Sequence, residues 1–342
     1  MLWFELSNHQ IIKSSNYEVN IPVSIEERVK KEIDFFCKGL PKEPHELYEP
    51  MRYMLSLGGK NLRPSLLLLT CKMFKGQVKD ALSAAIALEL FHNFTLIHDD
   101  ITDNSPLRRG KSTVHVKWNL NIALLSGDAL LIKAYQELNK TPAKYLPAIF
   151  RIFNDAALKV CEGQQFDMNY ETKSKVTIND YLTMISMKTA ALFSASMGMG
   201  AVLAGASNTD CTKMKVTGES LGMLFQLKDD VLDVFGKSGK TGKQIGGDII
   251  QDKKTFLLLK AFELAKGKTK TELHSLIGNT KINPLEKVEK VKRIYESLGV
   301  EEHANKQMQL YYSNAKKSLA SIKAPEKEIL LSLAEALLDR DK

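Results

Sequence analysis

Cysteine and tryptophan are scarce in this chain, with four and two copies among 342 residues. The cysteines form no CxxC pair and are too sparse for a disulfide-stabilised secreted scaffold, so we expect reduced thiols in the core at Cys37, Cys71, Cys161 and Cys211. The amino terminus, MLWFELSNHQ, lacks the basic leader and the unbroken apolar run of a signal peptide. These absences favour a cytoplasmic protein.

A strong excess of one charge is also absent. Lys and Arg outnumber Asp and Glu by 48 to 40, which gives a net charge of +8 and a pI near 9.0. This balance permits nucleic acid, anionic lipid or a phosphorylated substrate as a partner and does not choose among them. Hydrophobic residues at 44% and charged residues at 26% exclude a disordered or collagen-like chain.

Alternating strand patterns, long linkers and internal repeats are missing as well. Helical periodicity recurs instead, in segments 65–74, 79–100, 122–139, 145–162, 178–205, 212–235 and 324–338. Several segments are apolar on more than one face, which indicates helices buried among other helices. We predict an all-α protein with one large domain over residues 25–342, preceded by a weakly patterned extension at residues 1–24.

One uncharged stretch, Thr189–Thr209, is long enough to cross a bilayer as a helix. Its centre consists of Ala, Ser, Gly and Met rather than Leu and Phe, and no second span accompanies it. We therefore expect a small-residue helix packed inside a helical core and no transmembrane segment.

The most informative residues are two copies of the pattern DDxxD, each following an apolar helix: Asp99, Asp100 and Asp103, then Asp229, Asp230 and Asp233. Helix positions i and i+4 differ by about 40° in azimuth, so the first and last aspartate of each copy share a face. Asn104-Ser105-Pro106 ends the first helix and Gly236 the second. All six carboxylates are therefore expected near helix C-termini, where the dipole disfavours anions.

Such an arrangement requires a compensating cation. Oxygen ligands, retained waters and bridging to phosphate are typical of Mg2+, and neither copy has the glycine and distal glutamate of a calcium-binding EF-hand. The alternative is a solvated acidic helix end, which suits a single DDxxD better than two.

Basic residues in glycine-containing loops could face the metals and bind phosphate oxygens. Gly58-Gly59-Lys60 leads to Arg63, Arg108-Arg109-Gly110 follows the first acidic helix, and Gly242-Lys243 and Lys253-Lys254 follow the second. The Walker A pattern GxxxxGK[ST] is absent, which argues against a P-loop ATPase.

In this order the motifs resemble those of the trans-isoprenyl diphosphate synthases, the polyprenyl synthetase family. The match runs from about Tyr48 to Lys254 through GGKxxRP, His92, DDxxD with RRG, Lys188-Thr189, Gln226 with DDxxD, GKxxGxD and KKT. The resemblance implies a helical bundle around a deep central cavity, usually a homodimer, with a role in isoprenoid biosynthesis.

The resemblance also implies roles for the acidic residues and for the groups around the allylic diphosphate. Asp99, Asp103 and Asp229 would bind three Mg2+ ions directly, while Asp100, Asp230 and Asp233 would act mainly through waters. The allylic diphosphate would be held by Arg108, Lys188 and Lys243, with Lys253 nearby. Gln226 and the Thr189 backbone would lie beside the allylic carbon.

Isopentenyl diphosphate would bind at a second set of residues: Gly59, Lys60, Arg63, His92 and Arg109. The implied reaction is ionisation of an allylic diphosphate, attack by isopentenyl diphosphate and loss of a proton. Metals and fixed cations suit the leaving group, and an apolar cavity excludes water. Without the motif order, His92 would be read as a structural core histidine.

Product length in this family follows the residue five places before the first DDxxD, which is Phe94 here, with Thr95 next and Phe91 one turn earlier. A bulky ring there resembles short-chain enzymes. We favour geranylgeranyl diphosphate (C20), with farnesyl diphosphate (C15) close behind. Phe94 as ordinary core packing is the alternative.

Other functions stay open at this point. A longer-chain polyprenyl diphosphate synthase shares every motif, and a class I terpene cyclase shares the ionisation chemistry without needing a second diphosphate site. A di-iron bundle would need two Glu-x-x-His pairs. A basic helical protein that binds nucleic acid or a lipid surface leaves the six aspartates unexplained. The preferred primer and the consuming pathway are not indicated.

Overall fold

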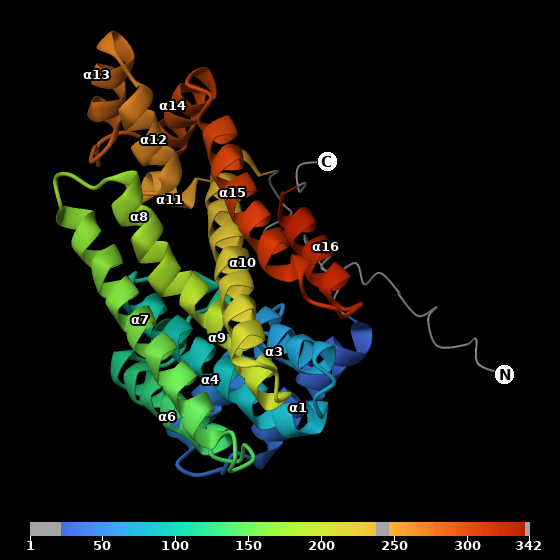
Figure 1. Cartoon of the computed structure of the whole chain (residues 1–342). Helices are drawn as coiled ribbons and strands as arrows, with labels where there is room; N and C mark the ends of the chain where they lie inside the picture. Colours follow the sequence, from blue (N-terminus) through green and yellow to red (C-terminus); the bar gives the residue numbers. More distant parts are fainter. Residues whose placement is uncertain (1–21, 237–245, 339–342) are drawn as a thin grey trace.

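Two long helices form the centre of the molecule: α4 (Val78–Thr102) and α10 (Asn208–Phe235), both packed against α9 (Ala191–Leu203). The computed structural model describes residues 22–236 and 246–338. Figure 1 shows α10 running lengthwise between α7–α8 on one side and α15–α16 on the other, with α11 to α14 at one end. The predicted all-α class is confirmed.

The remaining helices enclose this centre. They are α1 (Val23–Gly39), α2 (His45–Ser56), α3 (Leu62–Met73), α5 (Val114–Lys117), α6 (Leu120–Leu138), α7 (Leu146–Thr172), α8 (Ile178–Ile185), α11 (Gly247–Ile250), α12 (Phe256–Leu264), α13 (Gly267–Leu276), α14 (Pro284–Ser297), α15 (Val300–Ala320) and α16 (Lys327–Leu338). Most of the predicted extension lies outside the described residues, and α1 begins at Val23, inside its predicted boundary.

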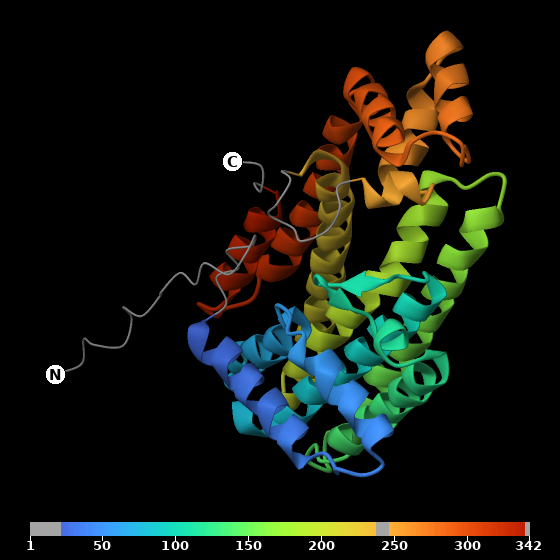
Figure 2. The same cartoon turned by 180° about the vertical axis from the view of Figure 1, so that it is seen from behind.

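Three details differ from the expectations. The segment 178–205 is not one helix, because the π-helical turn η1 (Ser186–Ala190) separates α8 from α9. Helix α7 continues ten residues past Glu162, to Thr172, through a polar stretch without clear periodicity. A small antiparallel hairpin, β1 (Leu107–Arg108) and β2 (Lys111–Ser112), turns at Arg109 and Gly110 and pairs Leu107 with Ser112 (Figure 2).

The small-residue stretch after Thr189 lies in the core as expected, and α9 is buried along nearly its whole length. Among the described residues, α4 is the one helix long and apolar enough to cross a membrane by length and composition. Most of that stretch of α4 is buried against α3, α6 and α9, as in the core helix of a globular bundle.

Close approach of α9 and α10 depends on missing side chains. A Cβ at Gly218 of α10 would lie 2.5 Å from the Phe193 carbonyl oxygen, and one at Gly222 would lie 2.5 Å from Cα of Ala190. Gly200 of α9 approaches α3 in the same way, 2.3 Å from the Leu67 carbonyl oxygen. Glycine at these positions lets the helices pack backbone against backbone.

Replacing Gly218 with alanine should therefore destabilise the protein by about 1–3 kcal/mol, since the added methyl meets backbone that cannot move alone. Gly39→Ala, at the end of α1, is the matched control, because its Cβ meets nothing within 4 Å. We expect the control to be neutral or more stable by up to about 1 kcal/mol. Denaturant unfolding measures both, and equal losses would contradict the packing argument.

Candidate active site

The first acidic cluster ends α4, as predicted. The helix finishes at Thr102, and the amide of Asp103 donates to the carbonyl oxygen of Asp99 at 2.8 Å. Asn104 follows in a left-handed backbone conformation, with φ 48°, and the chain no longer continues the helix there. Asp99 and Asp103, one turn apart, therefore lie on the same side of the last helical turn.

Asp100 is turned away from that side and is buried at 2% exposure. Both of its carboxylate oxygens accept hydrogen bonds from Arg108 of β1, each at 2.7 Å. Burial raises the pKa of Asp100, while the Arg108 guanidinium opposes the rise. The hairpin is thus anchored to the acidic helix end by a bidentate ion pair.

The second cluster occupies the last two turns of α10, which ends at Phe235. Asp230 is buried and accepts hydrogen bonds from the Tyr181 hydroxyl and from Gln226 Nε2, the latter at 3.0 Å. Gln226 Oε1 in turn accepts from the Thr189 hydroxyl at 2.9 Å. Burial raises the pKa of Asp230 well above its usual value, and nearby Asp248 adds to the rise.

The chain returns to this cluster after the part that is not described. The amide of Asp248 donates to a carboxylate oxygen of Asp233 at 3.0 Å, and the amide of Gly246 donates to its carbonyl oxygen at 2.7 Å. Gly246 adopts φ 77°, a left-handed conformation that favours glycine. Lys243, a predicted diphosphate contact, lies outside the described residues.

Lys253 lies between the first cluster and Asp248, whose amide is hydrogen-bonded to Asp233 of the second cluster. Its ammonium lies 3.5 Å from the Asp103 carboxylate. Desolvation lowers the pKa of Lys253, but Asp103, Asp248 and Asp167 outweigh it and leave that pKa raised. The ammonium is therefore held charged by carboxylates at the end of α4, on α11 and on α7.

Lys188 sits on η1, and its ammonium donates to the Asp167 carboxylate at 2.6 Å. Desolvation raises the pKa of Asp99, and the Lys188 charge opposes this rise. Gly163 lets α7 approach the turn, because a Cβ there would lie 2.4 Å from the Lys188 amide nitrogen. The sequence analysis did not identify Asp167, because this residue lies beyond the expected end of α7 at Glu162. The one signal in this polar stretch is an acidic residue two positions after Gln164-Gln165.

The predicted basic set is partly assembled. Arg63 Nη1 donates to His92 Nε2 at 3.1 Å, which requires the proton of the neutral imidazole to lie on Nδ1. Desolvation, followed by the charges of Arg63 and Arg109, lowers the pKa of His92 well below its usual value. Desolvation also lowers the pKa of Arg63 to about 10, while the Glu89 carboxylate opposes the shift.

The glycine loop lies against Arg109. A Cβ at Gly59 would be 2.9 Å from a guanidinium nitrogen of Arg109, so this side chain lies directly against the loop backbone. Lys60 follows in the same loop and is partly buried. Arg109 itself is exposed and turns the hairpin at φ 53°. The hairpin thus places the Arg109 guanidinium against the glycine loop.

The predicted chain-length residues form an aromatic cluster. Phe91 is fully buried against Phe153 of α7 at 5.4 Å between ring centroids, and Phe94 lies between Phe91 at 5.6 Å and His98 at 4.6 Å. The Thr95 hydroxyl donates to the His92 carbonyl oxygen at 2.8 Å, so it is turned back to its own helix. Phe153 is a member that the sequence did not identify.

Comparison with known proteins agrees with this architecture. A family model described as polyprenyl synthetase matches residues 44–298. Geranylgeranyl diphosphate synthase of Methanosarcina mazei is 37% identical over 302 residues, 87% of this chain and 91% of the relative. The enzyme of the same name from Sulfolobus acidocaldarius is 39% identical over 268 residues, 77% of this chain and 79% of the relative.

A solved structure described as geranylgeranyl pyrophosphate synthase superposes with a TM-score of 0.87 at 38% identity, covering 92% of this chain and 97% of the other. The extent of the family match, the identity and the shared fold agree with the order of motifs and with their convergence at the ends of α4 and α10. The chain belongs to the polyprenyl synthetase family.

Proposed function

We propose that the chain condenses isopentenyl diphosphate with an allylic diphosphate, in the cytoplasm, to give a short all-trans prenyl diphosphate. The observation that carries this proposal is the link between the two aspartate clusters: Lys253 pairs with Asp103 of the first and is influenced by Asp248, whose amide is bonded to Asp233 of the second. Basic groups at Arg63 and Arg109 accompany them. An acidic centre suits metal-bound diphosphate, and a basic centre suits a second diphosphate. The two centres together favour a two-substrate transferase over a terpene cyclase.

The acidic centre fits Mg2+. Its donors are carboxylate oxygens, and within residues 22–236 and 246–338 no three Asp, Glu, His or Cys side chains form a metal site by themselves. Mg2+ is commonly bound through one or two carboxylates and completes its shell with water and substrate phosphate. Asp99, Asp103 and Asp229 would hold the ions, three in number with allylic diphosphate bound. When bound, Mg2+ supplies positive charge that stabilises the leaving diphosphate.

Asp100 and Asp230 are better placed to support this centre than to bind metal directly. Asp100 accepts from Arg108 and Asp230 from Tyr181 and Gln226, so both carboxylates are already occupied by protein donors. Asp233 likewise accepts the Asp248 amide. This agrees with the water-mediated roles expected for the three residues.

The allylic diphosphate would be bound by cations that are each paired with a different carboxylate in this structure. Lys188 is paired with Asp167 and Lys253 with Asp103, and Arg108 is anchored by Asp100. Such pairs hold the cations in position before substrate arrives, which is the preorganisation that stabilises a developing anion at low cost. Lys243 completes the proposed set from outside the described residues.

The carbocation left by ionisation would form near Gln226 and Thr189. The Gln226 amide is fixed at both ends, since Nε2 donates to Asp230 and Oε1 accepts from Thr189. A carbonyl oxygen has a second lone pair. We propose that this oxygen and the Thr189 backbone carbonyl stabilise the cation while the buried helices exclude water.

Isopentenyl diphosphate would bind at Lys60, Arg63, His92 and Arg109 around Gly59. The neutral His92 can donate from Nδ1 to a phosphate oxygen while Nε2 accepts from Arg63. Carbon C4 then attacks the allylic cation, a new carbon–carbon bond forms, and a proton leaves C2 to the departing pyrophosphate. No nucleophilic side chain is required.

We further propose a C20 product, with C15 the nearest alternative and longer polyprenyl products the less favoured one. Phe94 lies one and a half turns before Asp99, about 7.5 Å along the helix. Its ring is supported by Phe91, which rests on Phe153. A ring held in place by two further rings could block the growing prenyl chain and so limit product length.

Asp99→Ala and Asp229→Ala should each lower Mg2+-dependent turnover by about a thousandfold, because each removes a carboxylate that compensates metal charge. The exposed Asp155→Ala of α7 is the matched control and should keep full activity. Steady-state assays with isopentenyl diphosphate and allylic primers measure this. Near-normal activity of either site variant would remove that aspartate from the metal assignment.

Phe94→Ala should shift products to longer chains, since loss of the ring opens space before Asp99. Phe35→Ala, a ring 74% exposed on α1, controls for the loss of an aromatic side chain. Chromatography of the products measures their chain lengths for both variants and for the unaltered enzyme. An unchanged profile would leave Phe94 as core packing.

A homodimer is also proposed, formed by an apolar surface on α5 and α6. Its exposed side chains are Val116, Leu120, Leu124, Leu125 and Ile132. Several exposed apolar side chains on two neighbouring helices are typical of protein interfaces. A second copy of the chain offers the same surface, as a two-fold symmetric interface requires.

Leu125→Glu should convert the dimer to monomer, because it places a charge in that surface. Leu310→Glu on α15 is the control, with the leucine 59% exposed against 61% at Leu125. Sedimentation velocity reports the mass of each variant. A dimeric Leu125→Glu protein, or a monomeric unaltered one, would overturn the proposed interface.

A further inference from the structure

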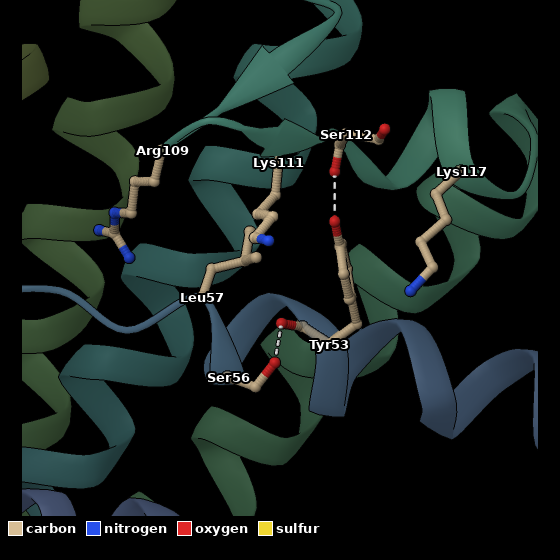
Figure 3. Close-up of a pocket in the computed structure, with 7 residues that line it drawn as sticks. All are labelled: Tyr53, Ser56, Leu57, Arg109, Lys111, Ser112 and Lys117. Atoms are coloured by element: carbon tan, nitrogen blue, oxygen red, sulfur yellow. Dashed lines mark hydrogen bonds between the residues drawn. The ribbon is translucent and has the colours of Figure 1, made fainter. Parts of the chain in front are cut away.

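A pocket of about 580 Å³ opens between the end of α2, the β1–β2 hairpin and α5 (Figure 3). Its lining residues are Tyr53, Ser56, Leu57, Arg109, Lys111, Ser112 and Lys117. The volume lies within the range of about 300–1,000 Å³ that is typical of small-molecule sites. Apart from Arg109, none of these residues has a part in the reaction as proposed above.

The walls of the pocket are tied together by specific contacts. The Tyr53 hydroxyl donates to the Ser112 carbonyl oxygen at 2.7 Å, which joins α2 to the hairpin (Figure 3). The Lys117 ammonium lies 3.7 Å from the Tyr53 ring centroid and 4.6 Å from that of Trp118. Cation–π contacts on two rings restrict the position of this ammonium at the edge of the pocket.

The charge of the pocket is one-sided. Three of its lining side chains, Arg109, Lys111 and Lys117, are cationic, and none of the described residues that line it is acidic. The charges of Glu89 and Asp100 act on Arg109 from outside the lining, and Lys111 and Lys117 are exposed. By contrast, Arg108, Lys188 and Lys253 are each paired directly with a carboxylate. Like charges around one cavity repel, so an anion of high charge density lowers the free energy of this arrangement.

Arg109 connects the pocket to the proposed isopentenyl diphosphate site. Its guanidinium lines the pocket and also lies against Gly59, in the loop that leads to Arg63. Leu57 and the Tyr53 ring add apolar surface next to the cations. A diphosphate with a short prenyl tail matches both features.

We infer that this pocket is a peripheral binding site for a diphosphate group, at which isopentenyl diphosphate is captured before it moves past Arg109 to Arg63 and His92. The inference rests on the proposed function. Released pyrophosphate carries the same group and is the other source of it. Lys111 and Lys117 attract the diphosphate group electrostatically and take no part in the bond-forming step.

The kinetic test is the double variant Lys111→Gln/Lys117→Gln. The KM for isopentenyl diphosphate should rise about tenfold, as for removal of charges that steer a ligand, with kcat and the KM for the allylic substrate unchanged. Its kcat/KM should also depend less on salt than that of the unaltered enzyme. Lys268→Gln/Lys270→Gln, exposed on α13 at one end of the molecule and away from the pocket (Figure 1), is the control with the same charge change.

A KM for isopentenyl diphosphate equal to that of the control would overturn the inference, as would an equal rise for both substrates. If the unaltered enzyme fails to condense the two substrates, the proposed function fails instead, and the pocket is still tested by binding. Circular dichroism confirms that both double variants are folded.

Calorimetry with inorganic pyrophosphate and with isopentenyl diphosphate, in metal-free buffer, gives that second test. The unaltered protein should bind one more ligand per chain than Lys111→Gln/Lys117→Gln. A difference with both ligands indicates recognition of the diphosphate alone, and a difference with isopentenyl diphosphate only indicates that the tail is recognised too. Equal stoichiometry with both ligands would overturn the inference.

Discussion

Repulsion among carboxylates at the ends of α4 and α10 is the constraint on which the rest of the structure depends. Both helices terminate where their dipoles already disfavour negative charge, and Lys253 and Asp248 link the two ends. Folding tolerates this because Arg108, Lys253 and Lys188 are brought in from the hairpin, the segment after α11 and η1. The arrangement is costly in the free protein, and the Mg2+ and diphosphate proposed to bind there would offset that cost.

The six aspartates divide into two kinds by their surroundings. Asp100 and Asp230 are buried and hydrogen-bonded to the protein, so they fix the positions of the hairpin and of Gln226. Asp99, Asp103, Asp229 and Asp233 are only partly buried, so solvent and ligands can reach them. The DDxxD spacing yields both kinds, since the second aspartate lies about 100° round the helix from the first.

Periodicity and termination signals were sufficient to predict the helical class and the position of both acidic clusters, because each depends on local sequence. Asp167 was missed because α7 extends past Glu162 through a polar stretch without clear periodicity, and α7 packs on η1, which lies far from it in the sequence. The turn at Ser186–Ala190 was missed because a π-turn leaves no mark on an apolar pattern. Phe153 and the Lys117 contacts arise from tertiary packing, which one sequence does not encode locally.

The π-turn has a consequence for the length of the chain. Such a turn holds one residue more than the α-helical turn it replaces. Deleting one residue between Ser186 and Ala190 would give an unbroken helix but rotate α8 by about 100° against α9. Tyr181 would then leave Asp230, and Lys188 and Thr189 would lose their separate partners. The spacing in this segment is therefore constrained independently of its composition, so single-residue insertions and deletions there should be less acceptable than substitutions.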